Sequence, residues 1–486
     1  MTLDRIIEGC NVLNSRGYLN VDIHSVCNDS RKVAPGALFV AVKGFASDGH
    51  DYIKNVIEKG AVAIIYEDES KVCDLPEGIT LVQVKSSRYA LAIAAANFYD
   101  NPSRKLTLVG ITGTNGKTTT VTLLHRMFTS MGYRCGLLST IANYVGEKGT
   151  EAVNTTSDPI TINSLLNEMV NAGCEYCFME VSSIGVEQER VAGLKFKAAL
   201  FSNLTHDHLD YHKTFAEYLR CKKLFFDNLD KDAIAVVNVD DRNGLVMTQN
   251  TAARVVTYSC RSMADHTCRV MEQSFEGMLL KMDGTETWSC LIGQHNAYNL
   301  LALYSTAVEL GADPMEVLVA ISTLKPAPGR LENMRGPKDI SVIIDYAHTP
   351  DALENVLKTL REIAPERELI CLFGCGGDRD KTKRPEMGLI AQKLADRIIV
   401  TSDNSRTENT ADIMADIKSG MDISGKAKSL FIEDREQAIR TAVMLAGPGA
   451  TILLAGKGHE TYQIIGKEKK HFDEKEIVTE IFKTLE

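Results

Sequence analysis

Hydrophobic residues along the chain form short continuous runs of strand length, separated by longer segments with the spacing of helices. The first hundred residues hold three such runs, at 38–44, 61–67 and 79–85. The segment 88–105 predicts a helix that stops at Asn101, because Pro102 disfavours helical geometry in the residue before it. We therefore place the first domain at 1–100.

The middle of the chain repeats this alternation, which is typical of a mostly parallel sheet. Its apolar runs lie at 105–111, 177–183, 198–204 and 233–239. Proline and glycine interrupt the segment 324–332, and we place the second boundary there. The chain then divides into an α/β central domain at 101–330 and an α/β last domain at 331–486.

The last section alternates most clearly. Its strand-like runs lie at 340–348, 368–380, 396–406, 428–434 and 450–460. Four of them end in polar clusters, at 345–348, 374–380, 403–406 and 456–460. Ligands of an open parallel sheet bind just beyond the carboxyl ends of its strands. Four polar clusters on one edge therefore predict a binding site there.

The composition is that of a globular protein, with 486 residues of which 44% are hydrophobic and 24% charged. The net charge of −10 argues against nucleic acid or an anionic membrane as partner, because both attract a basic face. No apolar run reaches the roughly 18 residues of a membrane span, and the N-terminus has no signal-peptide core. The scattered cysteines favour a reduced, cytoplasmic protein, which we expect to be a monomer.

The segment 110–124, GITGTNGKTTTVTLL, lies between a strand-like run and a helix-like run and predicts a phosphate-binding loop. Gly113 and Gly116 let backbone N–H groups point at phosphate oxygens, and the following helix presents its positive end to them. Lys117 can reach the β and γ phosphates, and the Thr118 hydroxyl can ligate Mg²⁺. The strict spacing of such loops would place glycine where Ile111 stands, so the loop is a variant. No N-K-x-D motif is present, which argues against a signalling GTPase.

Two segments that follow strands carry metal-ligand chemistry. Glu180 lies at a predicted strand end. The loop SNLTHDHLDYH contains His206, Asp207, His208, Asp210 and His212. Oxygen ligands with a single imidazole suit Mg²⁺ or Mn²⁺ around nucleotide phosphates. The three histidines leave zinc open as an alternative, although no cysteine is nearby.

Motifs along nearly the whole chain carry a wider resemblance. They are NDSRKVAPGALFVAVKGFASDGHDYI, GTNGKTT, MEVSS, NLTHDHLDYH, GQHNAYNLLAL, PGRLE, DYAHTPDALEN, GCGGDRDKTKRP, DNSR and AGKGHE. Together they resemble the Mur ligase family of peptidoglycan synthesis, and within it the enzymes that add the third amino acid. The resemblance implies an N-terminal domain for the uridine part of the substrate, a central P-loop, parallel-sheet domain for ATP, and a C-terminal Rossmann-like domain for the amino acid.

The resemblance also implies an ATP-driven amide ligase that acts on UDP-N-acetylmuramoyl-L-alanyl-D-glutamate and meso-2,6-diaminopimelate. The D-Glu γ-carboxylate would take the γ-phosphoryl group of ATP, and the incoming amine would attack the resulting acyl phosphate. Phosphorylation is needed because a carboxylate is a poor acylating agent. The transfer depends on charge neutralisation, for which Lys117 and Mg²⁺ would be central.

By the same resemblance, Thr118, Glu180 and His208 would hold Mg²⁺. Lys222 falls where the family carries a carbamylated lysine, which would ligate a second Mg²⁺. The catalytic set would then be Lys117, Lys222, Glu180 and His208. From its helix pattern alone, Lys222 would be a solvated lysine on a helix face.

Ligand contacts follow from the resemblance as well. For ATP they are Gly113, Thr114, Asn115, Gly116, Lys117, Thr118, Thr119, Asn299, Arg330 and Asp345. For the UDP-linked substrate they are Asn28, Ser30, Phe45, Ala46, Ser47, Asn154, Thr155, Thr156, Ser182, Gln188 and Arg190. Arg190 suits a substrate carboxylate because its guanidinium binds such a group bidentately.

Diaminopimelate carries a second amino-acid head that L-lysine lacks, so its recognition takes an extra cation and an extra acceptor. Asp403 and Arg406 of DNSR offer both, and Arg379 and Glu460 would complete a clamp. The whole set is Arg379, Asp403, Asn404, Ser405, Arg406, Gly456 and Glu460. Diaminopimelate-adding relatives typically have proline in place of Ser405, and lysine-adding relatives typically lack the arginine. Diaminopimelate is therefore favoured, and L-lysine is the alternative.

Two alternatives are more distant, and the second of them belongs to a different class. A folylpolyglutamate synthetase shares the central ligase chemistry, but it is not expected to carry the segments DSRKVAPGALFVA or DNSR. A regulatory ATP-binding protein without turnover is expected to have lost Lys117, Glu180 or His208, and all three are present.

Overall fold

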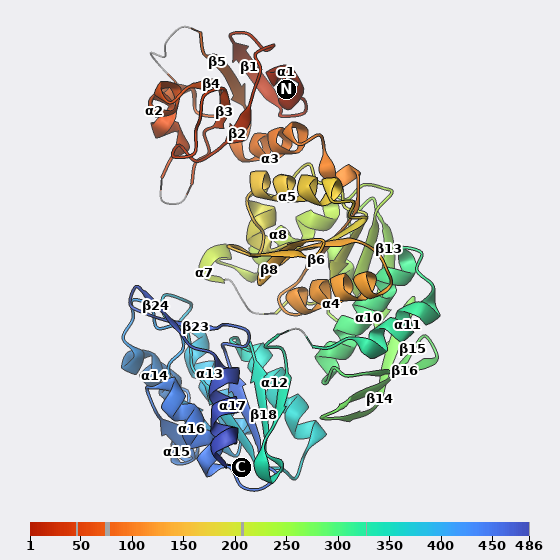
Figure 1. The fold of residues 1–486 in the computed structure, drawn as a ribbon, viewed down its shortest axis with the longest axis vertical. Helices are drawn as coiled ribbons and strands as arrows, with labels where there is room; N and C mark the ends of the chain where they lie inside the picture. The colour runs from red at the N-terminus through yellow and green to blue at the C-terminus, as the bar shows by residue number, and fades with distance from the viewer. Residues whose placement is uncertain (45–46, 73–77, 206–208, 327, 486) are drawn as a thin grey trace.

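The computed structural model describes residues 1–44, 47–72, 78–205, 209–326 and 328–485. Three β-sheets of five, eleven and six strands follow one another along the chain, and helices pack on each (Figure 1). In this view the five-stranded sheet lies at the top, the eleven-stranded sheet in the middle and the six-stranded sheet at the lower left. The α/β class expected from the sequence pattern is confirmed. Among the described residues, no helix has the length and apolar character needed to cross a membrane.

The first sheet has the order β1-β5-β4-β3-β2, with β1 antiparallel to β5 and the others parallel. Its strands are β1 (Val12–Arg16), β2 (Ser25–Cys27), β3 (Ala37–Val40), β4 (Ala61–Tyr66) and β5 (Thr80–Val84). Its helices are α1 (Leu3–Ile6), α2 (Ile53–Glu58) and α3 (Ser87–Phe98). One face of the sheet packs against α1 and α3 and the other against α2. The three predicted apolar runs are β3, β4 and β5.

Helix α3 ends at Phe98, earlier than the predicted stop at Asn101. Asp100 and Asn101 have left-handed backbone, with φ of 58° and 50°, so the chain reverses before the proline is reached. The short 3-10 helix η3 (Pro102–Arg104) then leads into the second sheet. Pro102 therefore begins the next element instead of ending the helix.

The second sheet has the order β16-β15-β14-β13-β12-β11-β6-β10-β7-β8-β9. Its parallel centre is β6 (Thr107–Thr112), β7 (Cys135–Leu138), β10 (Tyr176–Glu180), β11 (Ala198–Phe201), β12 (Ile234–Asn238) and β13 (Arg254–Ser259). At one end, β8 (Ala142–Val145) and β9 (Lys148–Glu151) continue the sheet in antiparallel pairs. At the other end, β14 (His266–Ser274) is parallel to β13, and β15 (Gly277–Met282) and β16 (Thr285–Ser289) follow it in antiparallel pairs. The sequence pattern did not predict these, because polar residues interrupt them; β9 is exposed along its whole length.

Helices cover both faces of the parallel centre. One face carries α4 (Lys117–Ser130), α10 (Gln294–Glu309) and α11 (Pro314–Thr323). The other carries α5 (Pro159–Asn171) and α8 (Phe215–Asp227). Shorter helices are α6 (Ser183–Glu187), α7 (Leu209–His212) and α9 (Gly244–Met247). Strand β6 therefore lies between two apolar layers and leads directly into α4.

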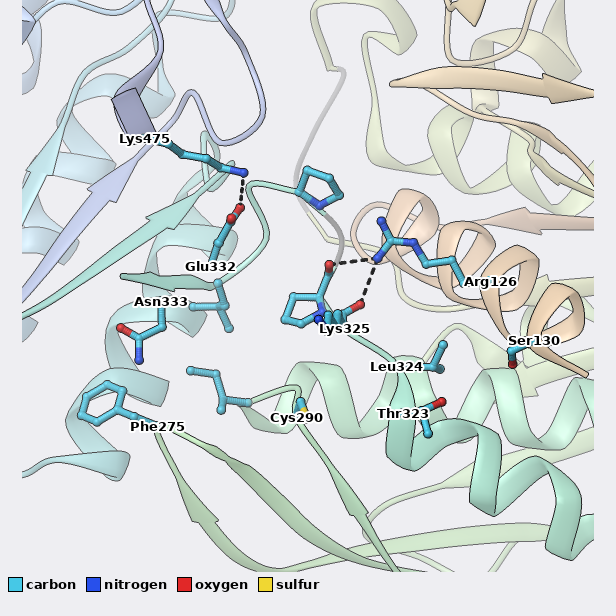
Figure 2. Close-up of a pocket in the computed structure, with 14 residues that line it drawn as sticks. Arg126, Ser130, Phe275, Cys290, Thr323, Leu324, Lys325, Glu332, Asn333 and Lys475 are labelled. Atoms are coloured by element: carbon cyan, nitrogen blue, oxygen red, sulfur yellow. Dashed lines mark hydrogen bonds and ion pairs between the residues drawn. The ribbon is translucent and has the colours of Figure 1, made fainter. Parts of the chain in front are cut away.

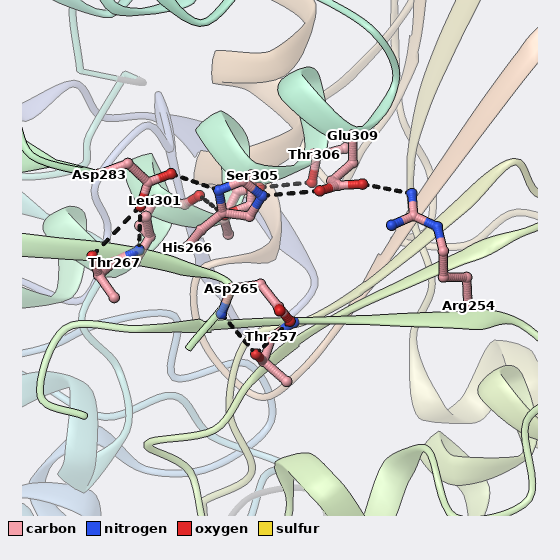
Figure 3. Close-up of polar contacts among 11 residues, drawn as sticks. Arg254, Thr257, Asp265, His266, Thr267, Asp283, Leu301, Ser305, Thr306 and Glu309 are labelled. Carbon is pink, nitrogen blue, oxygen red and sulfur yellow. Dashed lines mark hydrogen bonds and ion pairs between the residues drawn. The ribbon is translucent and has the colours of Figure 1, made fainter. Parts of the chain in front are cut away.

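A partly buried polar contact fastens strands β14 and β15 to α10 (Figure 3). The His266 ring lies between two carboxylates, with Nδ1 2.7 Å from Asp283 Oδ2 and Nε2 3.1 Å from Glu309 Oε1. Arg254 on β13 donates to the other oxygen of Glu309. Because α10 also carries Asn299, this contact steadies the helix that borders the phosphate loop.

The third sheet has the order β17-β18-β22-β19-β20-β21. Its strands are β17 (Glu332–Arg335), β18 (Ser341–Asp345), β19 (Leu369–Phe373), β20 (Arg397–Val400), β21 (Ser429–Phe431) and β22 (Thr451–Ala455), and β23 (Tyr462–Ile465) and β24 (Glu468–His471) form a separate hairpin. Its helices are α12 (Pro350–Ile363), α13 (Lys383–Leu394), α14 (Thr410–Ser419), α15 (Ile423–Ala427), α16 (Arg435–Leu445) and α17 (Glu474–Leu485). Strands β18 to β22 are parallel and fall in the five predicted runs, so their carboxyl ends share one edge.

Candidate active site

The phosphate loop runs from the end of β6 to the first residue of α4, Lys117. Gly113 has a φ of 153° and Gly116 a φ of 87°, conformations that side chains rarely adopt. A Cβ on Gly113 would collide with Ser202 Oγ, and one on Gly116 with Asn299 Oδ1. Both glycines are therefore required by backbone conformation and by close packing.

Ser202 and Asn203, just after β11, hold the phosphate loop through hydrogen bonds to Asn115. Asn203 accepts the Asn115 backbone N–H on Oδ1 at 2.9 Å, and Ser202 Oγ donates to the Asn115 carbonyl at 2.7 Å. The Thr114 hydroxyl lies 3.0 Å from the Tyr218 hydroxyl on α8. Sequence reasoning missed Ser202 and Asn203, although they precede the predicted metal loop directly. Hydrogen bonds to protein groups therefore fix the conformation of the phosphate loop.

Two lysine ammonium groups lie against this loop. Lys117 Nζ donates to the carbonyls of Gly113 and Thr114, each at 2.8 Å. Lys222 Nζ also donates to Gly113 O at 2.8 Å, and its residue is only 1% exposed. The expectation from the helix pattern that Lys222 is solvated is therefore wrong. It failed because α8 turns this face toward β6 and the loop, where it is covered.

Glu180 is the last residue of β10 and pairs in register with Ile111, the residue before the end of β6. Its Oε1 accepts the Thr140 backbone N–H at 2.8 Å. Its Oε2 is buried and has no hydrogen-bond partner among the described residues. A buried carboxylate oxygen of this kind suits a hard divalent cation. Thr118, in the first turn of α4, adds a buried hydroxyl on the neighbouring strand–helix junction.

The remaining metal candidates are divided between described and undescribed parts of the chain. His206, Asp207 and His208 lie outside the described residues, so their predicted role stays a prediction. His212 is buried and its Nε2 lies 2.8 Å from Ser183 Oγ, which is a structural contact between α7 and α6. Within the described ranges, no group of three or more His, Cys, Asp or Glu side chains could hold a metal ion.

The other predicted ATP residues lie on both sides of the boundary between the second and third sheets. Asn299 on α10 accepts the Thr120 hydroxyl on Oδ1 at 3.4 Å. Asp345, at the end of β18, accepts the backbone N–H groups of Leu331 and Ala347, and burial raises its pKa. Arg330 lies with its guanidinium 4.8 Å from the Tyr346 ring centre. Its Nε is buried without a partner in the described chain, which leaves a donor for a ligand.

One hydrogen bond joins the phosphate loop to the third domain. Asn115 Nδ2 donates to Asp351 Oδ2, in the first turn of α12, at 2.8 Å. Burial raises the pKa of Asp351. Sequence reasoning missed Asp351 because nothing in its local pattern distinguishes it from an ordinary N-terminal helix acid. The contact brings the third domain up against the loop.

Several predicted contacts of the UDP-linked substrate line one pocket of about 170 Å³ between the first and second domains. They are Asn28, Asn154, Gln188 and Arg190. Arg88 and Asp158, which sequence reasoning missed, also line it. Ser30 and Ser47 are not among its lining residues, and Phe45 and Ala46 lie outside the described chain.

Arg190 links this pocket to Glu180. Its Nη1 donates to the Thr156 carbonyl at 2.6 Å and its Nη2 to Gln188 Oε1 at 2.7 Å, while burial lowers its pKa. The Thr156 hydroxyl donates to the Glu180 carbonyl at 3.0 Å and accepts the Ser182 backbone N–H. The Thr155 hydroxyl accepts that of Thr140, the residue whose N–H binds Glu180. One connected network therefore runs from Arg190 to Glu180.

The four polar clusters of the third sheet meet at its carboxyl edge. Asn404 Nδ2 donates to Glu460 Oε2 at 2.9 Å, across the ends of β20 and β22. Arg406 Nη1 donates to the Gly377 carbonyl, beyond β19, at 2.8 Å. A Cβ on Gly456 would lie 2.6 Å from Asp403 Oδ2. The edge thus gathers an arginine and two carboxylates from the ends of β20 and β22, and a backbone carbonyl from the end of β19.

Arg406 and its neighbours have restricted backbones. Arg406 has a φ of 50°, and its N–H and carbonyl bond to Ile464 O and Gly466 N of the β23–β24 hairpin. Ser405 is buried, and its carbonyl accepts the Glu408 N–H. A Cβ on Gly376 would lie 3.0 Å from Arg406 Nη1 and 3.9 Å from Arg379 Cγ, so both arginines border this glycine. The hairpin therefore fixes the direction in which Arg406 leaves the chain.

A second cavity, of about 650 Å³, lies at the segment 324–332 that joins the two larger domains (Figure 2). Arg126 on α4 donates to the carbonyls of Lys325 and Pro326 at 3.1 Å. Lys475 on α17 pairs with Glu332 at 2.6 Å. These two cations hold the joining segment to both domains. The cavity's lining includes none of the predicted ATP or amino-acid contacts.

Family models match most of the chain. They are described as Mur ligase family, catalytic domain, at residues 22–99, as Mur ligase middle domain at 111–307, and as Mur ligase, glutamate ligase domain, at 329–458. Each match falls on one of the three sheets.

Curated relatives and solved structures match along the full length. The UDP-N-acetylmuramoyl-L-alanyl-D-glutamate–2,6-diaminopimelate ligase of Cytophaga hutchinsonii is 49% identical over 485 residues, which is 100% of each chain. The protein of the same name from Bacteroides fragilis is 49% identical over 483 residues, 99% of each chain. A solved structure of a ligase with this name has a TM-score of 0.71 and 30% identity, and it covers 100% of this chain and 99% of that one.

Proposed function

The chain belongs to the Mur ligase family, and on that premise we propose how it acts. It is an ATP-dependent amide ligase that joins meso-2,6-diaminopimelate to the D-Glu γ-carboxylate of UDP-N-acetylmuramoyl-L-alanyl-D-glutamate, in peptidoglycan synthesis. Relatives named for this reaction are 49% identical over the full chain, which supports the same activity.

In the first step, the γ-phosphoryl group of ATP passes to the γ-carboxylate and gives an acyl phosphate and ADP. The loop from Gly113 to Thr119 offers backbone N–H groups and the positive end of α4 to the phosphates. Lys117 exchanges its contacts with the Gly113 and Thr114 carbonyls for phosphate oxygens. Asn299, Asp345 and Arg330 hold the rest of the nucleotide, and the partnerless Arg330 Nε supports that role.

Mg²⁺, when bound, neutralises phosphate charge and favours phosphoryl transfer. Thr118, Glu180 and His208 would hold it, and a carbamylated Lys222 would hold a second ion. The partnerless, buried Oε2 of Glu180 supports this assignment. Burial of Lys222 beside the loop, with Nζ 2.8 Å from Gly113 O, supports a role in the site.

In the second step, the amine of diaminopimelate attacks the acyl carbon, and the C–O bond to phosphate breaks. Arg406 binds the distal carboxylate, and Asp403 and Glu460 accept from its ammonium group, with Arg379, Asn404, Ser405 and Gly456 completing the contact surface. The UDP-linked substrate lies along the pocket of Asn28, Asn154, Gln188 and Arg190 and continues past Ser30, Phe45 to Ser47, Thr155, Thr156 and Ser182. Its γ-carboxylate then ends near Glu180.

The reaction takes place in the cytoplasm, and the protein acts as a monomer. Every described cysteine is a free thiol, which agrees with a reducing compartment. Each of the three ligands has its contacts within a single chain, so the proposed site is complete without a partner copy.

The observation that carries this proposal is a phosphate loop on one domain and a charged strand edge on the next, with the two domains in contact at the loop through Asn115 and Asp351. The L-lysine-adding ligase is the second candidate, because Ser405 departs from the proline typical of diaminopimelate-adding relatives. Arg406 argues for diaminopimelate, since lysine has no distal carboxylate for it to bind.

Phosphate release tests the proposal, with ATP, Mg²⁺ and the UDP-linked substrate labelled with ¹⁸O in its γ-carboxylate. Parallel reactions receive diaminopimelate, L-lysine or neither. We expect release that depends on diaminopimelate, a product of the added mass and one ¹⁸O in the phosphate. Turnover with lysine alone would favour the second candidate. Absence of turnover with both diaminopimelate and L-lysine, or release of phosphate without the label, would overturn the proposed reaction.

A further inference from the structure

Lys457 is a fully buried lysine in the polar cluster after β22, with an exposed fraction of 0%. Its Nζ lies 3.0 Å from Glu460 Oε2 and 3.4 Å from Asn404 Oδ1. The rings of Tyr462 and Phe472 lie 5.7 and 5.9 Å from the same atom. Removing an ammonium group from water is costly unless it is paired. Its position beside the amino-acid edge therefore calls for a functional explanation.

The two oxygens of Glu460 have different surroundings. Oε2 accepts from both Asn404 Nδ2 and Lys457 Nζ, at 2.9 and 3.0 Å. In the described structure Oε1 makes no hydrogen bond, and the side chain is 12% exposed. One oxygen is thus fixed from the inside of the domain, and the other is left for a ligand.

We propose that Lys457 is a positioning residue for the amino-acid subsite. Its ion pair with Oε2 holds and orients the Glu460 carboxylate, so that Oε1 accepts a hydrogen bond from an ammonium group of the incoming amino acid. Lys457 does not touch the amino acid itself. This inference rests on the proposed function, in which Glu460 contacts diaminopimelate.

The other titratable or charged groups near Lys457 and Glu460 are paired elsewhere, are neutral at pH 7 or are negative like Glu460. They are Asp403 and Arg406 after β20, Tyr346 after β18, His459 and Tyr462 flanking Glu460, Arg435 on α16 and Glu474 on α17. Arg435 pairs with Glu474 at 2.8 Å, both fully buried, and Arg406 donates to Gly377 O. Burial lowers the pKa of His459 to about 4, so it supplies no charge at neutral pH. Among described residues, Lys457 is the cation in ion-pair contact with Glu460.

Loss of the Lys457 charge therefore leaves a half-buried carboxylate close to Asp403 and without its cation. Both burial and a neighbouring negative charge favour the protonated form of a carboxyl group. A protonated Glu460 no longer attracts an ammonium group. The consequence is a pH dependence of diaminopimelate binding that the intact protein lacks.

Lys457→Met, which keeps the length of the side chain and removes its charge, tests the proposal. KM is measured for diaminopimelate, ATP and the UDP-linked substrate between pH 6 and 9. Lys469→Met is the matched control, because Lys469 is an exposed lysine on the adjacent hairpin, 3.9 Å from the same Tyr462 ring. We expect Lys457→Met to raise KM for diaminopimelate about tenfold at pH 6, with recovery toward pH 9, and to leave KM for ATP unchanged. The control is expected to follow the wild type at every pH.

A double variant keeps the proposal testable if Lys457→Met folds poorly. Glu460→Gln removes the charge that Lys457 pairs with, and neutralising both partners avoids an unpaired buried carboxylate. Glu460→Gln alone and Lys457→Met/Glu460→Gln are expected to have the same KM for diaminopimelate within about twofold, at all pH values. A double variant much worse than Glu460→Gln would mean that Lys457 acts elsewhere.

Two failures have different meanings. Wild-type protein that does not use diaminopimelate would overturn the proposed function and this inference with it. Normal wild-type turnover, combined with a Lys457→Met variant whose three KM values rise together and independently of pH, would overturn this inference alone. Such a result would make Lys457 a residue of general stability.

Discussion

The phosphate loop of the second domain and the charged edge of the third are built by different means. The loop is contiguous, and its donors are backbone groups aimed by the left-handed Gly116 and the start of α4. The edge is assembled from side chains as far apart in sequence as Arg379 and Glu460, which meet only after the sheet has formed. Steric fit therefore shapes the first site, and ion pairing shapes the second.

This difference separates two tasks. Phosphates are alike in every ATP-using enzyme, and a backbone cradle recognises them without many side-chain charges. An amino acid is distinguished from its relatives by where its charges lie, so its site takes fixed opposite charges such as Arg406 and Glu460. We expect changes at the loop to alter catalysis with any amino acid, and changes at the edge to alter the choice among them.

Lys117→Ala gives the largest expected effect, because it removes the charge that the phosphoryl group meets in the transition state. We expect kcat to fall about 10³-fold, as for the loss of one major electrostatic contact in such enzymes. Phosphate release at saturating substrates measures the loss, and equilibrium binding of diaminopimelate checks the other site. A variant that keeps kcat and loses diaminopimelate binding would reverse the roles of the two sites.

Glu408→Gln tests whether ion pairs scaffold the edge. Glu408 binds the fully buried Arg384 at 2.9 Å and accepts the Asp378 N–H. The hydrogen bond from Arg384 holds its pKa at about 2. We expect the free energy of unfolding at pH 7 to fall by about 2 kcal/mol, since a buried arginine loses one charged partner.

The pH dependence of this loss follows from the depressed pKa of Glu408. A carboxyl whose folded pKa lies below its unfolded value stabilises the fold above that unfolded value, and the stabilisation disappears as pH falls through the folded pKa. The difference between wild type and variant should therefore shrink from about pH 4.5 toward pH 2. Urea unfolding at several pH values measures it, and a difference that persists at pH 2 would exclude the ionic explanation.

Gly116→Ala tests steric shaping of the loop and has the smallest expected effect. The new Cβ meets Asn299 Oδ1, whereas Gly132→Ala adds a Cβ at a similar φ of 94° with nothing within 4 Å. Both variants should lose about 1–2 kcal/mol of stability from backbone strain. Only Gly116→Ala should weaken ATP binding, by about tenfold or 1.4 kcal/mol. Titration calorimetry with ATP separates the two, and equal affinity in both variants would refute the packing argument.

The sequence alone predicted the features that are set by residues close together in the chain. Strands β18 to β22 follow from continuous apolar runs, and the loop from Gly113 to Thr119 follows from its glycines and lysine. The family resemblance, which rests on contiguous motifs, is confirmed by the full-length relatives.

Features that depend on packing between residues far apart in the sequence could not be predicted. The burial of Lys222 and Lys457 results from elements that cover them, and a lysine's own neighbours in sequence do not reveal that cover. Strands β8, β9 and β14 to β16 carry polar residues on exposed faces, so no apolar run marks them. Asp351 becomes notable only through its contact with Asn115 on another domain.

We infer that the third-domain edge chooses the amino acid and that the phosphate loop does not. Competition tests it most directly: wild type and Arg406→Ala receive equal concentrations of diaminopimelate and L-lysine with saturating ATP, and mass spectrometry gives the product ratio. We predict a wild-type product that contains almost only diaminopimelate, and a ratio about 100-fold lower in Arg406→Ala, since the loss of one charged hydrogen-bonded pair is worth about 3 kcal/mol. KM for ATP should be the same in both. An unchanged product ratio in Arg406→Ala would contradict the account.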